Sequence, residues 1–210
     1  CSPVPDIIEK NLRTLAVFAA VAAILALVPW VASSYMVSFL LLMFANIALA
    51  INIALIMAVL SAIGATRKDP ANGPEFVDFH GVRNLAEAAA AAKLDQLVIV
   101  SSAGVTREDH PLNRMFDNVL IWKGRGEDAV RASGVPYTIV RPGGLTDKPG
   151  GQAGVRLEQG DKGTGFIPRA DVARVCVAAL KSPAARNRTF ELYSAPSASP
   201  DMDWDAVFRK

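Results

Sequence analysis

Apolar positions follow two different patterns along the chain. Residues 14–66 carry no charged side chain, a run of 53 positions between Arg13 and Arg67, and most Lys, Arg, Asp and Glu residues lie after this run. A bilayer core about 30 Å thick requires roughly 20 apolar residues in a helix, so the run is long enough for two spans. We therefore predict a two-helix transmembrane hairpin over residues 15–31 and 35–56.

Basic residues at both ends of this hairpin predict its orientation. Lys10 and Arg13 precede it, and Arg67 and Lys68 follow it. The tendency of basic residues to stay in the cytoplasm places both ends there. We expect a protein of the bacterial inner membrane that contacts the lipid bilayer and other membrane-protein subunits, with its soluble domain in the cytoplasm.

Beyond the uncharged run, short apolar runs alternate with amphipathic segments. Buried strands are predicted at residues 97–100, 135–140 and 189–193. Helical spacing of apolar residues occurs over residues 78–93, 112–133 and 169–181. The glycine-rich residues 147–164 are predicted to be a loop. This alternation indicates an α/β fold with a parallel sheet and right-handed crossovers.

Residues 58–65 leave two interpretations open, because the segment AVLSAIGA fits either the end of the second span or a short buried strand. We divide the chain into an N-terminal segment, residues 1–57, a domain of residues 58–195 and a C-terminal tail, residues 196–210. The tail ends in an apolar segment around Trp204 and Phe208, which we expect to dock on a surface.

Charge and composition exclude several classes of function. Twenty-two basic and 20 acidic residues give a net charge of +2, too small and too evenly spread for a nucleic-acid surface. Two cysteines, Cys1 and Cys176, do not indicate a disulfide framework. His80 and His110 lack neighbouring ligands in a metal-binding spacing, so we expect no metal site.

The strand at residues 97–100 ends in Ser101 and Ser102. Small polar residues at the carboxyl end of a parallel strand suit a ligand crevice, although two serines can also simply cap the strand. Lys123 also has two interpretations, and the sequence alone slightly favours a solvated helix residue over a site residue.

Four ordered motifs carry a family resemblance over about residues 58–195. They read SAIGATRKDPANGPEFVDFHGVRNLAEAA, LVIVSSAGV, WKGRGEDAVRASGVPYTIVRPGGL and FIPRADVARVCVAAL. Together they resemble the C-terminal two thirds of an atypical short-chain dehydrogenase/reductase, in particular the NmrA-like NAD(P)H-binding proteins. The resemblance implies a partial Rossmann-like parallel sheet, preceded in this chain by the predicted transmembrane hairpin.

The resemblance also implies roles for individual residues. Ser102 takes the position of the catalytic serine, and Lys123 that of the active-site lysine that holds the nicotinamide ribose. A turn of Pro142, Gly143 and Gly144 packs against the nicotinamide, or is only a tight turn. The implied cofactor contacts are Ser61, Gly64, Ser101, Lys123, Pro142, Gly143 and Gly144.

The chain departs from this family pattern in three ways. Val119 stands where the family has its proton-donating tyrosine, and Asp78 stands where many relatives have asparagine. No G-x-x-G-x-x-G or G-x-G-x-x-G occurs, so a turn for the pyrophosphate is missing. Residues 58–65 are consequently expected to form an edge strand that invites a partner.

These departures lead to two functional hypotheses. The first is a membrane-anchored, degenerate short-chain dehydrogenase/reductase-like protein that acts as an accessory or assembly subunit of a membrane complex. The alternative is an NAD(P)H-dependent oxidoreductase or cofactor sensor whose phosphate-binding half comes from another chain. NAD(P) is the implied cofactor, and we expect this chain alone not to bind it. The apolar run also weakly resembles the first hairpin of a branched-chain amino-acid ABC transporter permease.

Overall fold

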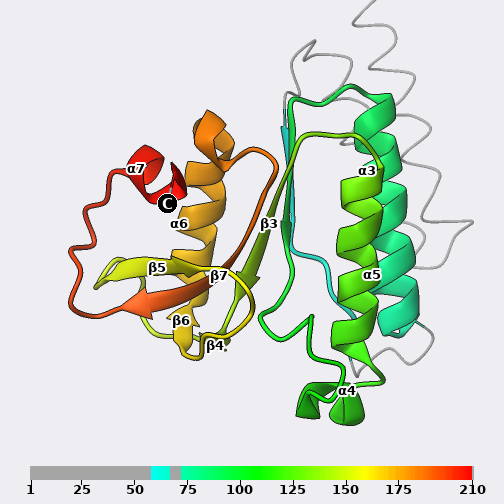
Figure 1. Ribbon diagram of the computed structural model, residues 1–210, viewed down its shortest axis with the longest axis horizontal. Coiled ribbons are helices and arrows are strands. Elements are labelled where there is room, and N and C mark those ends of the chain that lie inside the picture. Colours follow the sequence, from blue (N-terminus) through cyan, green and yellow to red (C-terminus); the bar gives the residue numbers. More distant parts are fainter. Residues whose placement is uncertain (1–57, 67–71, 210) are drawn as a thin grey trace, which may run out of the picture. The chain divides into compact units, whose positions relative to one another are not determined.

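The computed structural model describes residues 58–66 and 72–209, which fall within one compact unit, Met57–Lys210 (Figure 1). The predicted transmembrane helices, residues 15–31 and 35–56, and the permease-like segment lie outside the described residues. Among the residues that are described, no helix is long and apolar enough to cross a bilayer.

A five-stranded sheet with the order β1-β2-β3-β7-β5 forms the centre of this unit. Its strands are β1 Ala58–Ser61, β2 Gln96–Val100, β3 Tyr137–Pro142, β5 Gly154–Glu158 and β7 Arg188–Ala195. The first four in this order pair in parallel, as predicted, and residues 58–61 form an end strand of the described sheet. The prediction of a loop over residues 147–164 is wrong, because β5 lies within it and pairs antiparallel with β7. A second sheet consists of β4 Gly144–Thr146 and β6 Phe166–Pro168.

The described helices comprise those within the three predicted regions and two further short ones near the C-terminus, which were not predicted. They are the π-helix η3 Glu75–Gly81, α3 Val82–Ala91, α4 Pro111–Met115, α5 Val119–Ala132, α6 Arg169–Lys181, the 3-10 helix η4 Pro183–Ala185 and α7 Trp204–Arg209. The predicted helix over residues 169–181 is confirmed. The predicted helix over residues 78–93 begins earlier, in η3, and continues as α3.

The predicted single helix over residues 112–133 is wrong, because the chain breaks it between α4 and α5. Asp117 and Asn118 have φ angles of 48° and 60°, in the left-handed region that ends a helix. The Asn113 side chain replaces the lost backbone partners, since its Oδ1 accepts hydrogen bonds from the amides of Leu120 and Ile121 at 2.9 and 3.3 Å. A buried amide side chain therefore caps the first turn of α5, the helix that carries Lys123.

Helices cover both faces of the sheet: α3 and α5 lie on one side, and α6 with α7 on the other (Figure 1). Strand alternation explains how both faces are filled, since Leu97 and Ile99 of β2 pack with α3 and α5 residues while Val98 joins the α6 side. The predicted docking segment in the tail packs on its own domain. Phe208 is buried there, with its ring centroid 5.7 Å from that of Phe190.

The approach of α5 to η3 is closest at Gly126. A Cβ atom at this position would collide with the backbone carbonyl oxygen of Asp78, whereas a Cβ at Gly124, in the same helix, would lie 3.6 Å from its nearest neighbour, the carbonyl oxygen of Val105. The missing side chain of Gly126 thus sets how near Asp78 lies to α5.

We expect Gly126→Ala to lower the free energy of unfolding by about 1–3 kcal/mol, because overpacking displaces η3. Gly124→Ala is the matched control and should leave stability unchanged or raise it by up to about 1 kcal/mol, since alanine favours a helix. Urea denaturation followed by circular dichroism compares the two variants. Equal effects of both substitutions would contradict the close approach.

Candidate functional site

A narrow pocket with both apolar and polar walls lies at the carboxyl ends of β1 and β2. Its polar lining consists of Ser61, Asp78, Ser101 and Lys123. The pocket has a volume of about 10 Å³, which is room for about one water molecule or one hydroxyl group. Parallel strands present their carboxyl ends at one edge of the sheet, which is where α/β proteins bind ligands.

An ion pair between Lys123 of α5 and Asp78 of η3 dominates this pocket. The lysine Nζ lies 2.6 Å from Asp78 Oδ1, and the Asp78 side chain is fully buried. The second carboxylate oxygen accepts a hydrogen bond from the amide of Ala65 at 3.1 Å. A buried carboxylate requires such partners, and a charge-assisted hydrogen bond of this length holds the ammonium group in one place.

Gly64 and Ser101 leave this ion pair approachable. A Cβ atom at Gly64 would lie 3.6 Å from both Asp78 Oδ1 and Lys123 Nζ, so the absent side chain keeps the space beside the pair open. The Ser101 hydroxyl is buried, and it has no hydrogen-bond partner within residues 58–66 and 72–209. A buried hydroxyl without a partner is destabilising unless a ligand or water completes it.

The remaining predicted site residues lie at the ends of β2 and β3 and do not line this pocket. Ser102 does not line the pocket, and its hydroxyl donates to the carbonyl oxygen of Ala103 at 2.9 Å. The Pro142 carbonyl accepts from the amide of Ala103, and the amides of Gly143 and Gly144 donate to carbonyls of β7 and Gly165. The structure therefore brings together Ser61, Gly64, Ser101 and Lys123, and the roles of all these residues stay predictions.

Asp78 is the site residue that the sequence analysis missed, because there it registered only as a departure from the family. A usable signal was present. Asp78 precedes Val82 and Ala86 at four-residue spacing, and both of these are buried. An acidic residue on the apolar face of a helix needs a buried partner, and such a partner indicates a site.

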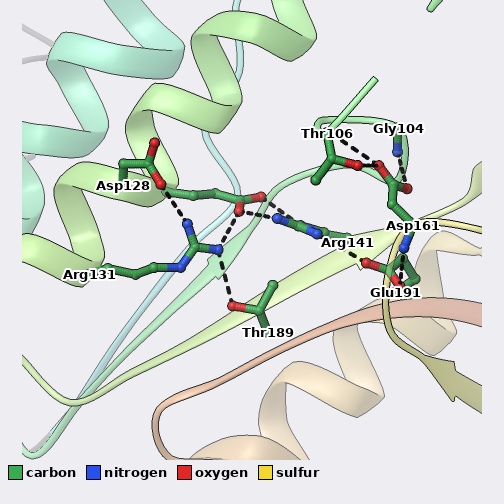
Figure 2. A network of polar contacts seen from close by, with 9 residues as sticks. Gly104, Thr106, Asp128, Arg131, Arg141, Asp161, Thr189 and Glu191 are labelled. Atoms are coloured by element: carbon green, nitrogen blue, oxygen red, sulfur yellow. Dashed lines mark hydrogen bonds and ion pairs between the residues drawn. The ribbon is translucent and has the colours of Figure 1, made fainter. Parts of the chain in front are cut away.

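Beneath the site, a network of buried charges joins the central strands to α5 (Figure 2). The Arg141 guanidinium of β3 donates two hydrogen bonds to Glu127 of α5, at 3.0 and 2.6 Å, and one to Glu191 of β7, at 3.1 Å. Burial lowers the pKa of Arg141, but hydrogen bonds and charge from Glu127 and Glu191 outweigh it, so the pKa is raised. Arg131, which is partly exposed, donates a further hydrogen bond of 2.7 Å to Glu127.

Asp161 links this network to the loop that follows Ser101 and Ser102. Its amide donates to Glu191, while its carboxylate accepts from the amide of Gly104 at 2.6 Å and from the amide and hydroxyl of Thr106 at 3.1 and 2.8 Å (Figure 2). Burial raises the pKa of Asp161, but these hydrogen bonds and the charge of Arg107 outweigh it and lower the pKa overall.

Cys176 and His110 are not among the residues that line the pocket. Burial raises the pKa of the Cys176 thiol to about 11, which keeps it protonated and unreactive. His110 Nδ1 accepts from the amide of Leu112 and caps α4. The described part of the chain has no group of three or more His, Cys, Asp or Glu side chains that could hold a metal ion.

Comparison with known proteins identifies relatives over most of this domain. Residues 45–183 match a family model described as NAD(P)H-binding. The chain is 40% identical over 147 residues to sanguinarine reductase of Eschscholzia californica, covering 67% of this chain and 54% of that protein. It is 42% identical over 142 residues to an uncharacterised chloroplastic protein of Arabidopsis thaliana, covering 64% of this chain and 44% of that protein. The chain thus spans about half the length of these curated relatives.

A solved structure supports the same fold. The Bacillus halodurans protein named "Putative NAD-dependent epimerase/dehydratase" superposes with a TM-score of 0.64 at 26% identity, covering 74% of this chain and 70% of that chain. The agreement supports the Rossmann-like parallel sheet that the motifs predicted.

These relatives correct two predictions. The prediction of a membrane-anchored accessory subunit is wrong, because the family model and the reductase favour the NAD(P)H-dependent alternative. The family match begins at residue 45, inside the predicted second span of residues 35–56. The predicted inner-membrane location is wrong as well, since the Arabidopsis thaliana relative is named chloroplastic. An uncharged apolar run signals burial, and a protein core and a lipid bilayer select the same composition.

We expect a pH-dependent effect from Asp161→Asn. Because the pKa of Asp161 is lower in the folded protein than its ordinary value of 3.8, the ionised carboxylate stabilises the fold above about pH 4. This contribution is lost as the pH falls through the folded-state pKa. The variant should lose about 1–3 kcal/mol of unfolding free energy at pH 7 and show a flatter pH dependence below about pH 4.

Urea denaturation at a series of pH values measures both effects. Asp128→Asn is the control, because that side chain is 79% exposed and forms an ion pair with the partly exposed Arg131. The same loss of stability and the same pH dependence in both variants would show that Asp161 is not the anchoring carboxylate.

Proposed function

The chain belongs to the NAD(P)H-binding family of atypical short-chain dehydrogenase/reductases, and on this basis we propose that it is an NAD(P)H-dependent oxidoreductase. Its described residues would hold the nicotinamide end of the cofactor. One observation carries the proposal: the buried Lys123–Asp78 pair lies beside the unpartnered Ser101 hydroxyl at the carboxyl edge of the sheet.

The pocket fits a hydroxyl of the nicotinamide ribose. An ammonium group has three donors, and Asp78 accepts from one of them. The others suit a ribose hydroxyl, whose own proton Ser101 Oγ can accept. Gly64 leaves the approach open, and the pocket has room for one group of this size. In this proposal Lys123 and Ser101 bind and orient the cofactor, and Asp78 positions Lys123.

The cofactor, when bound, supplies a hydride to the acceptor and is left oxidised. Val119, one turn before Lys123 on α5, has no proton to donate. A positioned general acid is worth about 10²–10⁴ in rate. We therefore propose an acceptor that is reduced without an acid at this position, and that any proton the product needs comes from water.

The pyrophosphate of the cofactor requires a different part of the fold. The 210-residue sequence contains no Gly-rich turn of the kind that binds it. We propose that these contacts come from outside residues 58–209. Reduced nicotinamide mononucleotide, which lacks the adenylate half, is therefore the probe that matches the described site.

We expect Lys123→Gln to weaken binding of reduced nicotinamide mononucleotide by about 10-fold or more, because one or two charge-assisted hydrogen bonds are lost. Lys181→Gln is the matched control, since Lys181 is also a helical lysine but lies on α6, on the opposite side of the sheet. Nicotinamide fluorescence and saturation-transfer NMR measure the binding.

Circular dichroism confirms that each variant is folded. The proposal fails if the parent chain shows no saturable binding at millimolar probe, or if folded Lys123→Gln binds as tightly as the parent. An added Asp78→Asn substitution keeps the fold testable, because it removes the carboxylate that Lys123→Gln would leave unpaired.

A further inference from the structure

The small β4–β6 sheet exposes an aromatic ring beside a second and larger pocket. Phe166 is 69% exposed, the highest value among the large apolar residues of the described chain. The pocket has a volume of about 490 Å³, within the roughly 300–1,000 Å³ range of small-molecule sites. Its lining includes Thr146, Pro149, Ala153, Phe166, Pro168 and Ser194.

The Phe166 ring packs against the backbone of β4. Gly144 pairs with Phe166 in the β4–β6 register, and a Cβ atom at Gly144 would lie 2.5 Å from the ring carbon Cδ1. Only glycine allows the ring to take this position. The aromatic face is therefore held in place by the backbone, although it has little protein cover, and a preorganised exposed ring favours a stacking ligand.

The same pocket also contains the hydroxyl oxygen of Thr146. Thr146 follows Gly144 by two residues and so shares its face of β4. The Thr146 hydroxyl is buried, and the described residues offer it no hydrogen-bond partner. A ligand atom that accepts a hydrogen bond would satisfy it.

The rest of the lining narrows the class of ligand. Its apolar walls are Pro149, Ala153, Ile167, Pro168 and Pro196. Lys148 and Gln152 also line the pocket, as does Asp171, whose Oδ1 accepts hydrogen bonds from the amide of Gly151 and from Arg174. Most of the lining surface is apolar, which favours a largely apolar ligand.

We propose that this pocket binds a flat, largely apolar hydride acceptor that stacks on Phe166 and accepts one hydrogen bond from Thr146. Its place in the fold fits that role, because β4 begins directly after Gly143, in the turn that the family resemblance assigns to the nicotinamide. The identity of the ligand as an acceptor rests on the proposed function, whereas the binding itself does not.

9-Fluorenone is the probe, because it is flat and apolar with one carbonyl acceptor, and binding is measured without cofactor. We expect Phe166→Ala to raise the dissociation constant at least fivefold. Phe76→Ala, which removes a phenyl group that is 61% exposed elsewhere on the chain, should change it less than twofold. Amide shifts in ¹⁵N NMR should map to β4 and β6.

The hydrogen bond is tested with fluorene, which has the same ring system but no carbonyl group. We expect Thr146→Val to weaken 9-fluorenone several-fold and to leave fluorene unchanged. Equal binding by Phe166→Ala and the parent chain, no saturable binding, or shifts confined to other elements would overturn the proposal. Since no cofactor is present, a failure of reduced nicotinamide mononucleotide to bind would count against the proposed function and not against this pocket.

Discussion

One buried arginine holds the layers of this domain together. Arg141 lies on the central strand β3 and contacts two buried carboxylates, Glu127 on α5 and Glu191 on β7. Two carboxylates can be buried side by side only if a cation is shared between them, because each would otherwise lose its solvation without compensation. The relative positions of the helix layer and the sheet therefore depend on this guanidinium.

The same constraint reaches the candidate site. Glu191 accepts from the amide of Asp161, whose carboxylate holds the amides of Gly104 and Thr106 in the loop after β2. That loop begins at Ser101, the residue with the unpartnered hydroxyl. On the other side, the close approach at Gly126 brings η3 against α5, so that Asp78 meets Lys123. The walls of the narrow pocket are thus positioned by two sets of contacts outside it, those of Asp161 and the close packing at Gly126.

The two pockets divide the chemistry between them. The narrow pocket offers charge and hydroxyl groups, which suit a ribose, while the larger pocket offers the exposed ring of Phe166 and the unpartnered hydroxyl of Thr146. The Gly143–Gly144 turn lies between them in the chain. With Val119 in place of a proton donor, specificity would rest on the shape of the acceptor and on orientation rather than on acid catalysis.

The sequence by itself determined the local elements and the family. The apolar pattern was sufficient for the helix at residues 169–181 and for the parallel strands β2, β3 and β7, and four ordered motifs identified the NAD(P)H-binding relatives. Only the tertiary structure decided that Asp78 pairs with Lys123, that Ser101 rather than Ser102 lines the pocket, and that β5 joins the sheet. Periodicity indicates which residues are buried, but it does not indicate their partners. The ion pair joins residues 45 positions apart, and β5 is a strand because it pairs with β7, so neither leaves a local pattern in the sequence.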